Sequence, residues 1–122
     1  MFIKDLFYTR RQIHNEVGGS LQQYLPTSKG RVVCACLTKE KNPTFPGTIL
    51  VGDRPLVKDT AALLCSQHEP IPVFLKEVRH KWRYVGLYKF DRDSISADDI
   101  SKYAEISGRT NITRVVHLVE VG

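Results

Sequence analysis

The residue types best suited to forming a binding site lie in the segment 72–90, where two apolar runs flank a short basic stretch. Trp82 and Tyr84 follow the basic residues 79–81 directly. Two interpretations of this segment stand side by side. Its aromatic residues are either core side chains of a small β domain or the wall of a binding site with cations beside it.

The basic residues indicate what such a site would bind. The net charge of +5 favours an anionic partner, nucleic acid first, because lysine and arginine neutralise phosphates. If two predicted loops meet, one basic patch would contain Lys39, Lys41, Arg79, His80, Lys81 and Arg83. A predicted helix places three further residues on one face, which is either solvated or a phosphate clamp: Arg10, Arg11 and His14.

The spacing of the reactive residues argues against an enzyme. The histidines and carboxylates lack the clustering of metal or hydrolytic sites, and there is no P-loop, GxGxxG or GxSxG pattern. Cys34 and Cys36 point to the same side of a strand but lack zinc or redox spacing, so buried free thiols are expected, as for Cys65. We therefore expect no metal and no cofactor, leaving open a catalytic site assembled from distant residues.

Local patterns predict the elements that must position these residues. The segment 72–90 predicts an antiparallel hairpin, and further strands are predicted at 31–38, 48–51 and 112–121. Within the hairpin, Gly86 indicates a bend or the close approach of another group. One face of its second strand would carry Tyr84, Gly86, Tyr88 and Phe90.

Cap residues predict three helices. One begins after Thr9, in a capping box with Gln12, and ends near Val17; a second is capped by Asp59 or Thr60 and ends near Gln67; a third begins at Ser96 and ends at Gly108.

The order of these elements predicts an α+β fold, a small curved β-barrel of five or six strands with two or three flanking helices. The length fits one domain, and no repeat or linker interrupts it, so residues 1–122 are expected to form a single domain. No apolar run is long enough to cross a bilayer and no signal-like core begins the chain, so the cytosol is the expected location.

Four short motifs stand in a characteristic order: Arg11-x-x-His14-x-x-x-Gly18-Gly19, Gly52-Asp53 before an Ala-containing helix, Pro72-Val73-Phe74-Leu75, and Trp82-Arg83-Tyr84-Val85-Gly86. In order and spacing, over about residues 11–90, the chain resembles the SRA/YDG-like domains of modification-dependent restriction endonucleases. Such domains belong to the PUA-like group, together with EVE, YTH and ASCH modules. The resemblance implies a compact curved barrel with flanking helices.

The resemblance also implies a module that reads a modified base in DNA or, less favoured, RNA. The base would be flipped into a pocket, stacked by aromatic rings and read at its edge. Asp53 matches the family's Gly-Asp turn, and Trp82 and Tyr84 match the strand that borders the pocket. Asn42 and Thr38, on the opposite loop and strand end, would add polar contacts. Phosphates would be held by Arg10, Arg11, Lys39, Lys41, Arg79 and Lys81.

The segment before Gly52 departs from the family pattern. It reads NPTFPGTILV instead of a tyrosine-rich and glycine-rich stretch, so either Phe45 takes over the stacking role or the pocket takes a different ligand. The usual nuclease domain does not accompany the motifs. An excised domain of a larger nuclease and a stand-alone protein related to modification-dependent defence are both consistent with this.

Two other functions are open at this point. ASCH-like domains include enzymes that act on nucleosides, and in this chain Asp53 or Glu77 would then serve as acid or base. A protein-interaction domain would instead present its basic face to an acidic partner.

Overall fold

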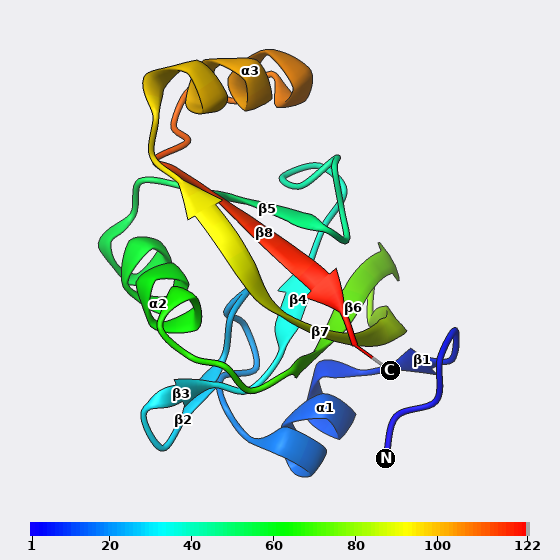
Figure 1. Cartoon of the computed structure of the whole chain (residues 1–122). Helices are drawn as coiled ribbons and strands as arrows, with labels where there is room; N and C mark the ends of the chain where they lie inside the picture. Colours follow the sequence, from blue (N-terminus) through cyan, green and yellow to red (C-terminus); the bar gives the residue numbers. More distant parts are fainter. Residues whose placement is uncertain (122) are drawn as a thin grey trace.

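The computed structural model describes residues 1–121, and most of its strands form one curled, mixed sheet (Figure 1). The strands are β1 (Phe7–Tyr8), β2 (Thr27–Ser28), β3 (Arg31–Val32), β4 (Ala35–Leu37), β5 (Thr48–Val51), β6 (Ile71–Val78), β7 (Lys81–Ser94) and β8 (Arg114–Glu120). The sheet order is β4-β6-β7-β8-β5, β1 also pairs with β7, and β2 and β3 form a separate two-stranded sheet. Only β4 and β6 run parallel.

Three helices accompany the sheet: α1 (Arg10–Val17), α2 (Pro55–Cys65) and α3 (Ala97–Ser107). Figure 1 shows α1 and α3 at opposite ends of the molecule, and α3 connects β7 to β8. The predicted α+β class, with a curled sheet and three helices, is confirmed.

The starts of α1 and α3 were predictable because they depend on neighbouring residues. The Gln12 amide N–H donates to Thr9 Oγ1 at 3.1 Å, and the Thr9 amide donates to Gln12 Oε1 at 2.8 Å, which completes the capping box. At α3, the Asp99 amide donates to Ser96 Oγ at 3.2 Å. Both predicted N-caps are therefore confirmed.

The predicted start of the second helix is wrong. α2 begins at Pro55, with Arg54 as its N-cap, and not at Asp59 or Thr60. Proline at the first helical position has a suitable φ and lacks an N–H that would have no partner there. Thr60 lies inside the helix instead, where its hydroxyl donates to the Leu56 carbonyl at 3.1 Å.

The predicted hairpin is confirmed as β6 and β7, joined by Arg79 and His80. His80 has a φ of +64°, the left-handed conformation that a tight turn requires. The second strand is longer than predicted, because β7 continues past Phe90, where the predicted hairpin ends, to Ser94. Its last residues are held because they pair with β8.

A bulge in β7 overturns the prediction that Tyr84 and Tyr88 share a face. Val73 pairs with Gly86 but Phe74 pairs with Tyr84, so Val85 is an extra residue. The bend predicted at Gly86 is confirmed, since its φ is +136° and Glu120 Oε2 lies 2.8 Å from where a Cβ would be. The bulge turns Tyr84 toward one face of the sheet and Tyr88 toward the other.

The predicted strand 31–38 is divided between the two sheets as β3 and β4. The Gln67 side chain explains the division at Val32. Its Oε1 accepts from the Val32 amide and its Nε2 donates to the Val32 carbonyl, both at 2.9 Å, so these two groups do not bond to a strand of the main sheet. Val32 lies opposite Thr27 of β2 instead. The Cys36 amide then bonds to the Tyr24 carbonyl at 2.8 Å. Hydrogen bonds between residues so far apart in the chain cannot be predicted from local sequence patterns.

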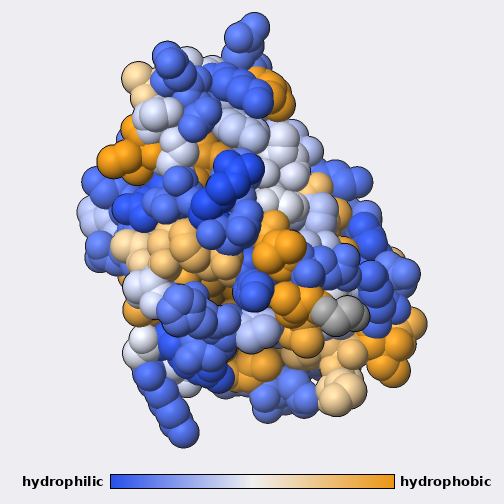
Figure 2. All heavy atoms as spheres, in the orientation of Figure 1, coloured by the Kyte–Doolittle hydropathy of each residue, from blue (hydrophilic) through white to orange (hydrophobic). Residues whose placement is uncertain are grey.

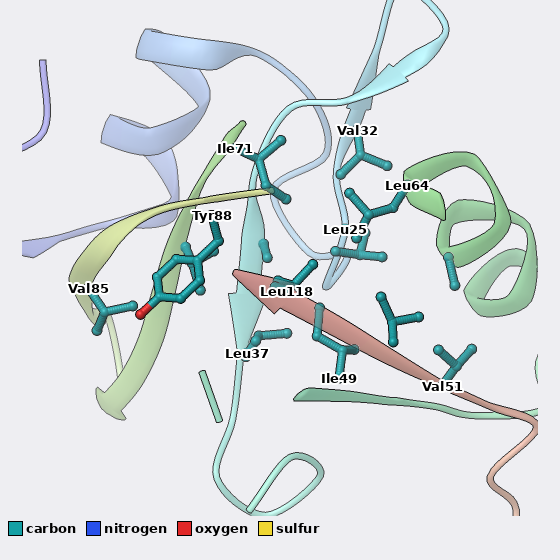
Figure 3. Packing of buried hydrophobic residues seen from close by; sticks show 14 of the residues in the cluster. Leu25, Val32, Leu37, Ile49, Val51, Leu64, Ile71, Val85, Tyr88 and Leu118 are labelled. Atoms are coloured by element: carbon teal, nitrogen blue, oxygen red, sulfur yellow. The ribbon is translucent and has the colours of Figure 1, made fainter. Parts of the chain in front are cut away.

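Two groups of buried side chains lie on the faces of the sheet. In the main core, side chains from the strands and from α2 converge, among them Leu37, Ile49, Leu64 and Leu118 (Figure 3). The second group, here called the aromatic cluster, consists of Ile13, Val33, Cys34, Cys36, Phe74, Trp82 and Tyr84.

At the N-terminus, Phe2 packs against the aromatic cluster. The Phe2 ring packs at 4.9 Å from that of Phe74 and at 5.6 Å from that of Tyr84, measured between centroids. Ile3, Leu6 and Phe7 stay exposed. Figure 2 shows apolar side chains on the surface near the two termini.

The last strand, β8, is shorter than the predicted 112–121. Within residues 1–121, none of the helices has the length and apolarity that crossing a bilayer requires.

The Gln67 contact yields a stability prediction. Gln67→Met keeps the side-chain length but leaves the buried N–H and C=O of Val32 without partners, and we expect the free energy of unfolding to fall by about 2–4 kcal/mol. Urea denaturation measures this. The matched control, exposed Gln22→Met, is expected to change the free energy of unfolding by less than about 0.5 kcal/mol. Equal effects of the two substitutions would contradict the role of Gln67.

Candidate nucleic-acid interface

A groove with a volume of about 1080 Å³ lies between segments that are distant in the sequence. Its lining comes from residues 21–24, residues 38–42, the start of α2, the tip of the β6–β7 hairpin and residues 109–111. Several of these segments are loops held by the sheet, where binding residues are common. We call this hollow the basic groove.

Positive charge is concentrated in the basic groove. Its lining contains six cationic side chains, from Arg10, Lys41, Arg54, Lys76, Arg79 and Arg109. Two carboxylates, of Glu40 and Asp53, oppose them. With His80 neutral the lining carries a net charge of +4, whereas the whole chain carries +5. A groove lined by one sign of charge focuses the electrostatic potential and attracts the opposite charge.

Trp82 lies in the lining but is only 8% exposed. Two cations lie near its ring: the Arg10 Cζ is 5.2 Å and the Lys76 Nζ 5.9 Å from the centroid, both within cation–π range. Lys76 is also the residue opposite Trp82 in the β6–β7 pairing. Trp82 therefore makes cation–π contacts with two cations of the groove and also packs in the aromatic cluster.

Arg10 stabilises one wall of the groove by hydrogen bonds to backbone carbonyls. Its Nη2 donates to the Ser20 carbonyl at 2.9 Å and to the Gln23 carbonyl at 2.8 Å. These bonds tie the start of α1 to the loop that precedes β2. The guanidinium is thus committed to the protein's own backbone.

Arg109 stabilises the other side of the groove, also by hydrogen bonds to backbone carbonyls. Its Nη1 donates to the Lys41 carbonyl at 2.8 Å and to the Leu50 carbonyl at 3.0 Å. The Nη2 atom lies 3.2 Å from where a Cβ on Gly52 would be, so glycine there leaves room for the guanidinium. Burial lowers the pKa of Arg109. No local pattern singled out this arginine in the sequence.

The polar residues predicted from the resemblance also lie here. Asn42 is buried. Its side-chain Oδ1 accepts from the Leu50 backbone amide at 2.8 Å, and its backbone N–H donates to the Thr38 carbonyl at 3.0 Å. Asp53 is exposed and accepts from the Asn111 side-chain amide at 3.5 Å. Asn42 therefore shapes the loop, whereas Asp53 and Asn111 offer polar groups to a ligand.

Tyr24 is a further aromatic residue of the groove and was not among the residues predicted for the site. Its hydroxyl donates to the Val57 carbonyl at 2.6 Å, which connects the loop to α2. Burial raises the pKa of Tyr24 to about 12.

The structure brings together most of the residues expected at the site, but not all. Trp82, Asp53, Asn42, Thr38, Arg10, Lys41 and Arg79 line the basic groove. Five others do not, namely Tyr84, Phe45, Arg11, Lys39 and Lys81. The bulge directs Tyr84 into the aromatic cluster, and Phe45 packs on the main core. Arg11 is exposed on α1. The Lys81 Nζ atom lies 6.0 Å from the centroid of the Phe7 ring.

A smaller hollow of about 520 Å³ adjoins the groove and contains Lys39 and Glu77. It shares Lys41, Lys76 and Arg79 with the groove, so the positive surface continues into it. Arg83 Nε donates to Glu77 Oε1 at 2.7 Å, and this hydrogen bond lowers the pKa of Glu77. That interaction favours an ionised, paired carboxylate over a proton donor.

Comparison with known proteins gives one match. The model of a family described as a domain of unknown function (DUF6697) matches residues 7–115, from the start of β1 into β8. Every segment that lines the basic groove lies within the match. No curated protein and no solved structure matches the chain.

The raised pKa of Tyr24 predicts a pH dependence of stability. An unfolded tyrosine loses its proton near pH 10, whereas the folded protein retains it to about pH 12. The unfolded state then binds fewer protons, so stability falls as the pH rises from about 10 to 12, by about 2–3 kcal/mol for this group.

Urea denaturation across this pH range measures the effect. Tyr24→Phe removes the titrating group, and we expect a smaller loss of stability than in the wild type. Tyr103→Phe, on α3 and outside the groove, is the control and should retain the wild-type loss. A Tyr24→Phe variant that loses as much stability as the wild type would contradict the assignment.

Proposed function

The chain belongs to the DUF6697 family, and we propose that its basic groove binds a strand of nucleic acid. One observation carries the proposal: six cationic side chains from segments far apart in the sequence converge on one groove, with a net charge of +4. Phosphate contacts by lysine and arginine release counterions from the nucleic acid and supply much of its binding free energy.

The cations divide into two groups by their contacts. Arg10 and Arg109 are half-buried and donate to backbone carbonyls, so they hold the walls. Lys41, Lys76 and Arg79 are exposed, as is Arg54. These four side chains are the phosphate contacts that we propose, because a ligand can reach them without breaking the protein's own hydrogen bonds.

The polar side chains of the groove favour a single strand, or a base turned out of a duplex, as the ligand. Asp53 and Asn111 present a carboxylate and an amide, groups that recognise the edges of bases. A paired base hides its Watson–Crick edge, whereas an unstacked base offers it. The carboxylate of Asp53 would accept a hydrogen bond from an exocyclic amine.

The preference for a modified base is the more specific part of the proposal, and it is supported by the resemblance to SRA/YDG-like domains. The curled sheet is compatible with the small PUA-like barrel that the resemblance implies. The aromatic residues are in part those expected. Trp82 lines the groove, whereas Tyr84 and Phe45 lie outside it and Tyr24 lines it in addition.

The phosphate contacts are tested by Lys76→Ala combined with Arg79→Ala. We expect affinity for a labelled single-stranded oligonucleotide to fall by about tenfold or more. The slope of log K against log salt should decrease by about 1.4–1.8, for two lost phosphate contacts. Fluorescence anisotropy at about 50 and 200 mM salt measures both quantities.

The matched control is Arg11→Ala combined with Lys89→Ala, which removes the same charge from exposed sites outside the groove. It should retain near-wild-type affinity. Equal weakening by the two double variants would mean that net charge alone, and not the groove, determines binding. Salt-independent binding would contradict phosphate recognition altogether.

Base reading is tested with oligonucleotides that carry cytosine, 5-methylcytosine or 5-hydroxymethylcytosine, as single strands and as duplexes of DNA and RNA. We expect a preference of about tenfold, or about 1.4 kcal/mol, for one modified base. Asp53→Asn should reduce this preference while general affinity is retained, and Asp98→Asn on α3 should leave it unchanged. Binding without any preference would contradict modified-base reading and leave the phosphate contacts in place.

A further inference from the structure

Cys34 and Cys36 form a buried thiol pair. Residues two apart in an extended segment point to the same side, and the two Sγ atoms lie 4.0 Å from each other. Cys34 is fully buried and Cys36 is 3% exposed. Both belong to the aromatic cluster and neither is part of a disulfide.

The pair lies next to the basic groove. Cys36 is one of the residues that line it, whereas Cys34 lies behind in the aromatic cluster. Trp82 borders both the groove and the cluster. Of the two cysteines, Cys36 is therefore the one that borders the groove.

From this geometry we propose that Cys34 and Cys36 bind one soft monovalent metal ion of the Cu(I) class. Thiolates are the ligands such ions prefer. Among residues 1–121 no group of three His, Cys, Asp or Glu side chains is placed to hold a metal, whereas zinc takes four ligands. Two sulfurs suffice for a soft monovalent ion, which accepts two-coordinate binding.

The spacing of the sulfurs is close to what this binding requires. Metal–sulfur bonds of roughly 2.2–2.3 Å on either side of the ion would separate the sulfurs by roughly 4.5 Å. The observed 4.0 Å reaches that separation by small rotations of the two side chains.

The charge of the bound state also has a partner. Binding releases one proton from each thiol to solvent, so a monovalent ion held by two thiolates carries a net charge of −1. Arg10, whose Cζ lies 5.2 Å from the Trp82 ring centroid, is a cation beside the same cluster and would offset this charge.

The test uses Ag(I) as a probe that undergoes no redox chemistry, under reducing, oxygen-free conditions. The protein is the Cys65→Ser variant, which keeps the pair and removes the third thiol. About a tenfold excess of glutathione over protein is included, because a single thiol competes poorly with a chelating pair. We expect one ion retained per chain by native mass spectrometry, with quenching of Trp82, the chain's one tryptophan.

Adding Cys34→Ala or Cys36→Ala to this variant should abolish retention of the ion, with circular dichroism as the check on folding. Failure of the Cys65→Ser protein to retain Ag(I) would overturn the proposal, whatever the alanine variants do. Retention by a folded protein that lacks one thiol of the pair would overturn it too. Neither result depends on nucleic-acid binding.

Discussion

The pairing of β7 along its whole length is the constraint on which the remaining structure depends. β7 spans 14 residues and pairs with β6, β1 and β8, and the bulge at Val85 changes which face its side chains reach. Residues before the bulge join the aromatic cluster, and those after it join the main core. The same strand places Trp82 opposite Lys76 beside the hairpin tip, so its path fixes one wall of the basic groove.

Two of the positive charges in the groove are stabilised by hydrogen bonds within the protein, which offsets part of the repulsion between them and the other cations. Arg10 and Arg109 each donate two hydrogen bonds to backbone carbonyls, and such bonds to charged groups stabilise more than neutral ones. Lys76 and Arg10 also lie over the negative face of the Trp82 ring. The cations that remain exposed repel one another in the free protein, and a polyanion would relieve that repulsion.

The features that the sequence predicts are those set by nearby residues. The capping box at Thr9, the cap at Ser96, the hairpin and the conformation of Gly86 all depend on contacts within a few residues or on a single residue type. The site was predictable only in part, because its remaining members are defined by distance in space. Arg109 and Asn111 reach the groove across 50 or more residues, and the turn of Tyr84 away from it depends on a one-residue bulge.

The central claim, that the basic groove is the surface that binds nucleic acid, is tested most directly by mapping the contact. Nuclear magnetic resonance of the ¹⁵N-labelled protein, titrated with a short single-stranded oligonucleotide, reports each residue separately. The account predicts shifts of the Trp82 indole N–H, of the Asn111 side-chain amide and of backbone amides in 38–42 and 76–80. Shifts confined to α3 or to the outer face of α1, with these signals unmoved, would contradict it.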